Sequence, residues 1–222
     1  MQFICSIPTG TLRGALKCAA VKDVRFYLCG VYLERCDGKL YVVSTTGSHM
    51  FVADISHVEC AAEGNWSLII PSELLKAALK GNKASFLNLH GEPERGKPIE
   101  LRSGDTAFGG KSVDGVFPDW RRVTPAKDAE LDTGLTNYDP EILLACHEAL
   151  AEHNGVAKGK VAGAGFLYRL KGGCSVIVGT TPSAFCIVVA RRDGQHDYPG
   201  WFTAPYPLKA AAAITKATGS AA

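Results

Sequence analysis

The chain has 222 residues, of which 46% are hydrophobic and 21% are charged, and its formal net charge at pH 7 is only +2. This length allows one or two domains with a sizeable core, and the near-neutral balance excludes a protein that grips nucleic acid by bulk basicity alone. No apolar run approaches the ~20 residues of a membrane-spanning helix, and the first eight residues lack the features of a secretion signal. We therefore expect a cytoplasmic protein with no membrane partner.

Four segments of the chain share one pattern, a strand that ends near a proline and then a short helix. The prolines are Pro8, Pro71, Pro140 and Pro207, at intervals of 63, 69 and 67 residues. Such a near-constant interval is typical of a repeated supersecondary unit. Proline suits the start of a helix, because its missing N–H would have no partner there. The predicted helices are residues 11–17, 72–80, 141–150 and 208–217, and Ser72 is predicted as an N-cap.

Between these helices the pattern changes to extended segments separated by turn signals such as Asp37-Gly38. The predicted strands are residues 24–33, 39–44, 50–55, 85–89, 99–102, 106–108, 164–170, 174–178 and 184–191. Each unit is therefore approximately β-α-β-β-β, and two units make one domain of the α+β class. Residues 1–125 hold two complete units. Residues 126–222 hold a complete third unit and a fourth that ends just after its helix, which predicts a shortened second domain.

Three sequence blocks carry a family resemblance. They are residues 23–30 (DVRFYLCG), 44–50 (STTGSHM) and 111–125 (KSVDGVFPDWRRVTP). In this order and at this spacing they resemble the middle domain of the bacterial DNA polymerase III beta subunit, the replicative sliding clamp. The resemblance implies the DNA-clamp fold, in which helices lie on one face of curved antiparallel sheets and line the inside of a ring. It also implies that the protein performs no chemistry on DNA and is not an enzyme.

In this family a surface pocket receives short peptides from DNA polymerases and the clamp loader. Matched position by position, the resemblance places the pocket at Leu28, Thr45, Gly47, Ser48, His49, Met50, Pro118, Arg122 and Val123. An apolar slot with a few polar contacts is the usual form of such a site. Ser48 and His49 stand where the family has His and Arg, and Thr46 replaces an Asp, so we expect a different peptide preference. Taken singly, Leu28 and Met50 lie on apolar predicted strands and are better explained as core residues.

Two pairs of basic residues are predicted to contact DNA. The pairs are Arg13 with Lys17 and Lys76 with Lys80. The members of each pair are four residues apart and share one helix face, from which they would touch phosphates without reading sequence. Charge spacing alone favours an ordinary solvated helix face, and the third predicted helix carries glutamates in place of a matching basic stripe.

No catalytic or metal-binding constellation stands out. The eight cysteines lie at positions 5, 18, 29, 36, 60, 146, 174 and 186. Because no two are three residues apart, a zinc knuckle and a thioredoxin-like motif are both excluded. We expect reduced structural cysteines, with no metal and no cofactor. His147 and His153 are six apart and lie on different faces of their helix, which makes a poor metal pair.

The function predicted from the residues and the resemblance is a processivity factor of DNA replication, encoded by a bacterium or phage. It would encircle DNA as a homo-oligomer, a trimer or dimer ring, and tether a polymerase through the pocket. The alternative is a clamp mimic or interaction module that binds clamp-binding peptides without encircling DNA. The last residues can be aligned with the family pattern in two ways. Residues 208–217 are the helix of a fourth repeat, which their composition favours, or residues 204–208 are a closing tail as in the bacterial clamp.

Overall fold

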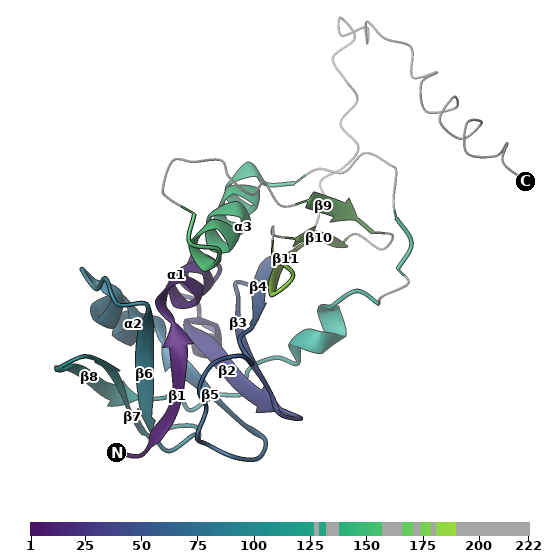
Figure 1. The fold of residues 1–222 in the computed structure, drawn as a ribbon. Helices are drawn as coiled ribbons and strands as arrows, with labels where there is room; N and C mark the ends of the chain where they lie inside the picture. Colours follow the sequence, from purple (N-terminus) through teal and green to yellow (C-terminus); the bar gives the residue numbers. More distant parts are fainter. Residues whose placement is uncertain (127–128, 132–137, 157–165, 171–173, 179–180, 190–222) are drawn as a thin grey trace, which may run out of the picture. The chain divides into compact units, whose positions relative to one another are not determined.

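The computed structural model describes residues 1–126, 129–131, 138–156, 166–170, 174–178 and 181–189. All of these lie in one unit of the chain, Met1–Arg191. Within this part the chain forms two antiparallel sheets with α-helices packed on one face (Figure 1), which confirms the predicted α+β class. No helix in the described segments is long and apolar enough to cross a membrane.

Two sheets make up the strand layer. The smaller, in the order β1-β6-β7-β8, contains β1 (Phe3–Pro8), β6 (Phe86–Gly91), β7 (Pro98–Ser103) and β8 (Thr106–Lys111). The larger, in the order β5-β2-β3-β4-β11-β10-β9, contains β2 (Gly30–Cys36), β3 (Lys39–Thr45), β4 (His49–Asp54), β5 (Trp66–Pro71), β9 (Phe166–Arg169), β10 (Cys174–Val178) and β11 (Ala184–Val189). Every neighbouring pair is antiparallel.

The first two repeats exchange their opening strands. β1 opens the first repeat but pairs with β6 of the second, with Ile7 opposite Leu87. β5 opens the second repeat but pairs with β2 of the first, with Val31 opposite Ile70. Each repeat therefore completes the sheet of the other, and the two together form one interlocked body.

The helices α1 (Thr9–Lys17), α2 (Ser72–Leu79) and α3 (Pro140–His153) begin at the repeated prolines. Pro8 and Pro71 are the N-cap residues of the first two, with extended backbone that leads directly from strand into helix. Asp139 caps α3 by accepting a hydrogen bond from the Glu141 backbone N–H at 2.9 Å. The predicted N-cap role of Ser72 is wrong: it is the first helical residue, and its buried Oγ has no hydrogen-bond partner in the described part of the chain.

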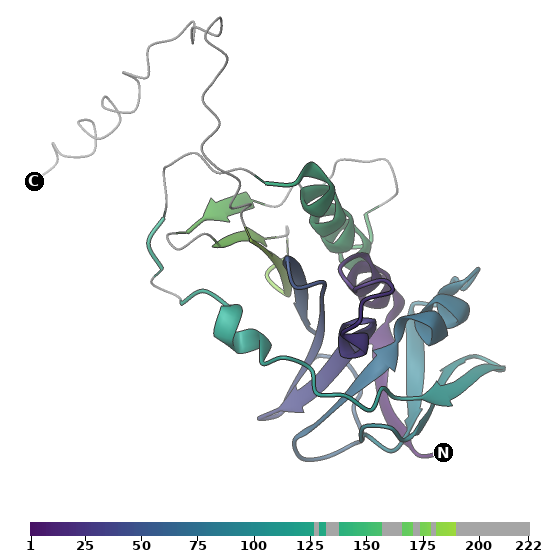
Figure 2. The same cartoon turned by 180° about the vertical axis from the view of Figure 1, so that it is seen from behind.

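Helices α1 and α3 pack closely side by side, and both views show α3, α1 and α2 following one another in a row (Figures 1 and 2). Two glycines of α1 permit this approach. A Cβ built on Gly14 would lie 2.4 Å from the Ala149 carbonyl oxygen, and one on Gly10 would lie 2.5 Å from that of Glu152. The contact therefore depends on the absence of side chains at these two positions.

Buried side chains form two clusters, one on each face of the larger sheet. The first lies beneath the helices and includes Leu12, Val42 and Leu75. The second lies on the opposite face and includes Val43 and Trp120. Val42 and Val43 fall in different clusters because successive side chains of a strand point to opposite faces. Figure 2 shows the chain around residues 112–123 passing along the side of the sheet away from the helices.

The predicted strand at residues 24–33 is only partly correct. β2 begins at Gly30, and Phe26–Leu28 is instead a short 3₁₀ helix. The cause is local: the Asp23 carboxylate accepts a hydrogen bond from the Arg25 backbone N–H at 2.8 Å, a turn that aspartate favours. The other predicted strands in the described segments agree with the structure to within a few residues.

The third repeat joins the first through the larger sheet. After α3 come β9, β10 and β11, and β11 pairs with β4, with Cys186 opposite Phe51. Strands from both sides of the predicted boundary at residue 125 therefore belong to one sheet, while the boundary itself stays a prediction. The fourth predicted repeat, including both alignments of its end, lies outside the described residues.

Candidate functional site

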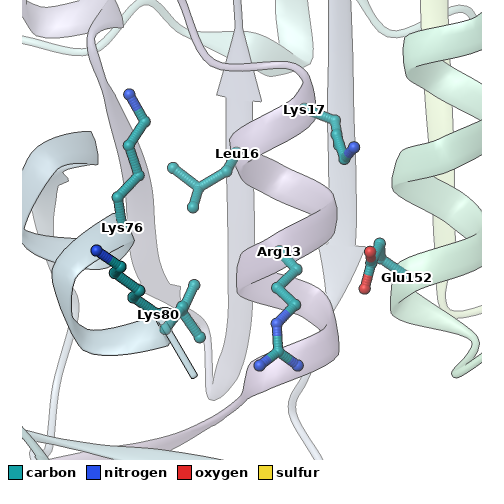
Figure 3. A pocket seen from close by; sticks show the side chains of 7 residues that line it. Arg13, Leu16, Lys17, Lys76, Lys80 and Glu152 are labelled. Atoms are coloured by element: carbon teal, nitrogen blue, oxygen red, sulfur yellow. The ribbon is translucent and has the colours of Figure 1, made fainter. Parts of the chain in front are cut away.

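All four basic residues predicted to contact DNA line one hollow on the helix side of the molecule (Figure 3). The hollow has a volume of about 390 Å³ and is lined by Arg13, Leu16, Lys17, Lys76, Leu79, Lys80 and Glu152. We call it the basic hollow. The sequence pattern placed each pair on one helix face, and the structure adds that the two faces meet.

The cations reach the basic hollow from two helices. Arg13 and Lys17 lie one turn apart on α1, and Lys76 lies on α2, with Lys80 directly after its end. Leu16 and Leu79 complete the lining with apolar side chains. These two leucines were absent from the sequence prediction, although their helical spacing from the cations could have identified them.

Exposed contacts hold three of the four cations. Lys17 Nζ lies 2.6 Å from Glu148 Oε2 on α3, and Lys76 Nζ lies 2.8 Å from Glu73 Oε1. Arg13 donates a hydrogen bond to the Asn82 carbonyl. Exposed ion pairs of this kind contribute about 0–1 kcal/mol each, so a phosphate group can replace a glutamate at low cost.

Lys80 is exposed and has no ion-pair partner among the described residues. Next to it lies a second hollow of about 290 Å³, which is also lined by Lys83. Glu152 of α3 is the acidic member of the basic hollow. The helix side is therefore basic along α1 and α2 and acidic where α3 meets α1.

The three blocks that carry the family resemblance come together on the other side of the larger sheet. Arg25 of the first block donates a hydrogen bond from Nη2 to the Thr46 carbonyl of the second at 3.0 Å. Leu28, Met50 and Trp120, one from each block, belong to the same buried cluster. Blocks that are up to about 90 residues apart in the chain thus pack around one buried cluster.

The turn between β3 and β4 is held by its own side chains. Thr45 Oγ1 donates to the His49 carbonyl at 2.7 Å and accepts from the Gly47 backbone N–H at 2.9 Å. Gly47 has φ of +96°, a conformation that disfavours other residues. His49 is buried, with its Nδ1 3.0 Å from Thr46 Oγ1. The glycine in this block is therefore required by the turn.

Aromatic stacking fastens the third block to the sheet. The Phe117 ring stacks on Tyr32 of β2 at a centroid distance of 4.5 Å and an interplanar angle of 4°. The Trp120 ring lies 5.4 Å from that of Tyr41 on β3. Tyr32 and Tyr41 were not among the site residues predicted from the sequence. The only signal for them was that each lies in a predicted strand.

One carboxylate anchors the same block. Glu34 Oε2 accepts hydrogen bonds from Trp120 Nε1 at 3.0 Å and from Arg121 Nη1 at 2.7 Å. The Arg121 guanidinium also lies over the Trp120 ring, 4.3 Å from its centroid. Arg121 is thus a structural residue, whereas the Arg122 side chain forms no hydrogen bond or ion pair with another described residue.

The nine predicted pocket residues divide by exposure. Leu28, His49 and Met50 are buried and Thr45 is partly buried. The exposed members are Gly47, Ser48, Pro118, Arg122 and Val123. An apolar slot is therefore not open at the Leu28 and Met50 side chains, which form the floor beneath an exposed surface. We call the five exposed residues the outer patch.

Among curated proteins, the chain is similar in sequence to beta sliding clamps. The chain is 28% identical over 120 residues to the beta sliding clamp of Caulobacter vibrioides, covering 51% of this chain and 31% of that protein. It is 32% identical over 128 residues to the clamp of Proteus mirabilis, covering 54% and 33%. The matched region is thus about a third of the length of these relatives. No protein-family model matches the chain.

Solved structures show the same fold. A DNA polymerase sliding clamp from Pseudomonas aeruginosa matches with a TM-score of 0.60 at 17% identity, covering 85% of this chain and 67% of that one. A Helicobacter pylori beta clamp bound to a DNA ligase peptide matches with a TM-score of 0.64 at 12% identity, covering 86% and 66%. These likenesses confirm the DNA-clamp fold. Together with the curated relatives, they support a place for the chain among beta-clamp-like proteins.

Proposed function

We propose that this protein is a processivity factor of the sliding-clamp type, which encircles DNA and holds a polymerase on it. The observation that carries the proposal is the basic hollow, in which Arg13, Lys17, Lys76 and Lys80 converge from two helices. Cations on helix faces bind phosphates through charge and carry no sequence information. Such contacts allow a protein to move along a duplex, which a processivity factor requires.

The ring itself is part of the proposal. A clamp ring of six domains needs three copies of a two-domain chain, and a dimer is the other closed form we consider. Copies in a closed ring meet head to tail through the same pair of surfaces. β8 (Thr106–Lys111) is an edge of the smaller sheet and has a free side among the described residues. Unpaired strand edges of this kind can pair with another chain.

The outer patch is the proposed attachment surface for partner peptides. The relative from Helicobacter pylori binds a DNA ligase peptide, and by analogy the same surface here would bind short motifs of a polymerase or clamp loader. Within the outer patch Arg122 would supply polar contacts, while Pro118 and Val123 would supply apolar area. The protein would therefore act by binding alone, in the cytoplasm, without catalysis or a cofactor for this role.

Retention on closed DNA tests the proposal. The full chain would be loaded onto nicked circular DNA, isolated by gel filtration, and then treated with a nuclease that linearises the circle. We expect retention on the circle and release after linearisation, together with a trimeric or dimeric mass in solution. A strictly monomeric protein that leaves circular and linear DNA at the same rate would overturn the encircling function.

A second candidate is a clamp mimic that binds clamp-binding peptides without encircling DNA. The specific observation that favours it is the acidic side of α3, where Glu148 pairs with Lys17 and Glu152 lines the basic hollow. These carboxylates reduce the attraction for phosphate. Peptide binding at the outer patch by a monomer that does not bind DNA would support this candidate.

A further inference from the structure

Three cysteines from separate parts of the chain meet inside the fold. They are Cys18, directly after α1, Cys146 in α3 and Cys186 in β11. Their sulfur atoms all lie within 4.8 Å of one another, and none of the three residues is exposed to solvent. The sequence spacings are 128 and 40 residues, so no local motif marks this cluster.

The spacing of the sulfur atoms is close to that of a metal–thiolate site. A tetrahedral Zn²⁺ ion with Zn–S bonds of ~2.3 Å holds its sulfurs ~3.8 Å apart. The three sulfurs would therefore need to move together by no more than about 1 Å. Each is carried by a helix, a helix end or a strand, which are rigid supports for a binding site.

A direct contact joins two members of the cluster. Cys186 Sγ donates a hydrogen bond to the backbone carbonyl of Cys146 at 3.7 Å, so strand β11 and helix α3 already meet at these residues. A bound cation would compensate the loss of the thiol protons.

His49 supplies an independent observation. Its Nδ1 lies 3.0 Å from Thr46 Oγ1, whereas its Nε2 is buried and has no hydrogen-bond partner among the residues that the structure describes. A histidine held through one ring nitrogen with the other left free is the usual arrangement of a metal ligand. His49 lies two residues before Phe51 on β4, and Phe51 is opposite Cys186, so His49 and Cys186 are on the same face of the sheet.

We propose that Cys18, Cys146 and Cys186 bind one thiophilic metal ion, Zn²⁺ or Cu⁺. When the ion is Zn²⁺, His49 is the fourth ligand, and its side chain has to move toward the cluster, because its ring nitrogens do not lie within 4.8 Å of all three sulfurs. Soft thiolate ligands select these ions over hard cations such as Mg²⁺. Each thiol that binds gives up its proton to solvent, and no electron is transferred. The ion would tie α3 and β11 to α1, and so fix the segment after residue 125 to the first repeat.

Metal titration of the full reduced chain tests the site. The unaltered protein should bind one equivalent of Co²⁺ with thiolate-to-cobalt charge-transfer absorption, and Zn²⁺ should displace it; a parallel titration with Cu⁺ tests the other ion. Cys146→Ala should weaken the affinity for the bound ion by about tenfold or more. Cys5→Ala is the matched control, because Cys5 is equally buried but lies outside the cluster. Equal binding by both variants, or no stoichiometric binding of either ion, would overturn the proposal.

The role of His49 is tested separately. His49→Ala should weaken Zn²⁺ binding by about tenfold or more and leave Cu⁺ binding unchanged, because Cu⁺ is satisfied by three thiolates. Unchanged Zn²⁺ affinity would remove His49 from the site. If a cysteine variant fails to fold, pulsed thiol labelling of the unaltered chain in urea replaces it. Metal should then slow labelling of residues 18, 146 and 186 but not of Cys5, and equal labelling with and without metal would contradict the site.

Discussion

Lys17 Nζ lies 2.6 Å from Glu148 Oε2, and this contact joins the basic side of α1 to the acidic side of α3. The two side chains are 41% and 46% exposed, so solvent screens the pair and its contribution to stability is small. Its importance is for binding. A DNA phosphate that approaches Lys17 has to compete with a carboxylate that belongs to the third repeat.

Removal of that carboxylate should strengthen DNA binding. Glu148→Gln frees Lys17 and is expected to raise the affinity for duplex DNA by up to about fivefold, which corresponds to an exposed ion pair of ~1 kcal/mol. Fluorescence anisotropy at low salt measures this. Glu141→Gln makes the same charge change on an exposed residue of α3 outside the basic hollow. If both variants bind equally well, the effect comes from net charge and not from the Lys17 pair.

Loss of two cations from the basic hollow should change the salt dependence. Lys76→Ala with Lys80→Ala is expected to weaken binding to all sequences alike and to reduce the slope of log K against log salt by about 2. The control is Lys22→Ala with Lys39→Ala, since these exposed lysines lie outside the hollow and outside β8. An unchanged slope in the first variant would remove α2 from the DNA surface.

A methyl group at Gly14 should disrupt the contact of α1 with α3. The added Cβ would lie 2.4 Å from the Ala149 carbonyl oxygen, and overpacking of this kind costs about 1–3 kcal/mol of unfolding free energy. Urea denaturation measures the loss. Gly109→Ala is the matched control, because it also adds one methyl group to a glycine but meets no atom within 4 Å. Equal stability of the two variants would show that α3 moves away without cost.

Substitution of two adjacent arginines should affect different properties, stability for Arg121 and peptide binding for Arg122. Arg121→Ala breaks the contacts with Glu34 and Trp120 and is expected to lower stability by about 1 kcal/mol, the scale of an exposed ion pair with a cation–π contact. Arg122→Ala should leave stability unchanged and weaken binding of a clamp-binding peptide to the outer patch, as should Pro118→Ala. Denaturation and peptide titration of each variant separate the roles. Peptide affinity that is unchanged by Arg122→Ala contradicts the proposed patch.

The turn at Asp23 should be sensitive to acid. The hydrogen bonds from the Arg25 side chain and backbone lower the pKa of Asp23 from 3.8 to about 2. Because the pKa is lower in the folded state, the contribution to stability is present above about pH 4 and is lost as the pH falls through 2. A carboxyl titration followed by NMR measures the pKa. Arg25→Ala should return it toward 3.8, and a value that does not change would identify another cause.

The local structure was largely predictable from the sequence, because proline and apolar periodicity act over a few residues. The helices after Pro8 and Pro71 follow from those signals. The strand expected at 24–33 was only partly correct, because the Asp23 side chain competes for the backbone hydrogen bonds before Gly30. The stacking of Phe117 on Tyr32 was not predictable, since it depends on which strands of a sheet are neighbours.

The sites were predictable to different degrees. Basic residues four apart on a helix identify a common face, but only the fold shows that the faces of α1 and α2 meet in one hollow. The pocket positions came from the family resemblance, and they stay a prediction. The cluster around Cys146 could not be predicted from the sequence. Short metal-binding motifs place cysteines three residues apart, whereas here the fold joins sulfurs from three elements that are distant in the chain.

The exchange of β1 and β5 between the first two repeats has a consequence for how the chain is made. During synthesis β1 leaves the ribosome long before its partner β6, which ends at Gly91. Until then its apolar residues have no sheet to join, and contacts at such long range slow folding. The first repeat cannot therefore mature alone on the ribosome. A nascent chain stalled before residue 86 should remain protease-sensitive, and one extended past residue 111 should become resistant.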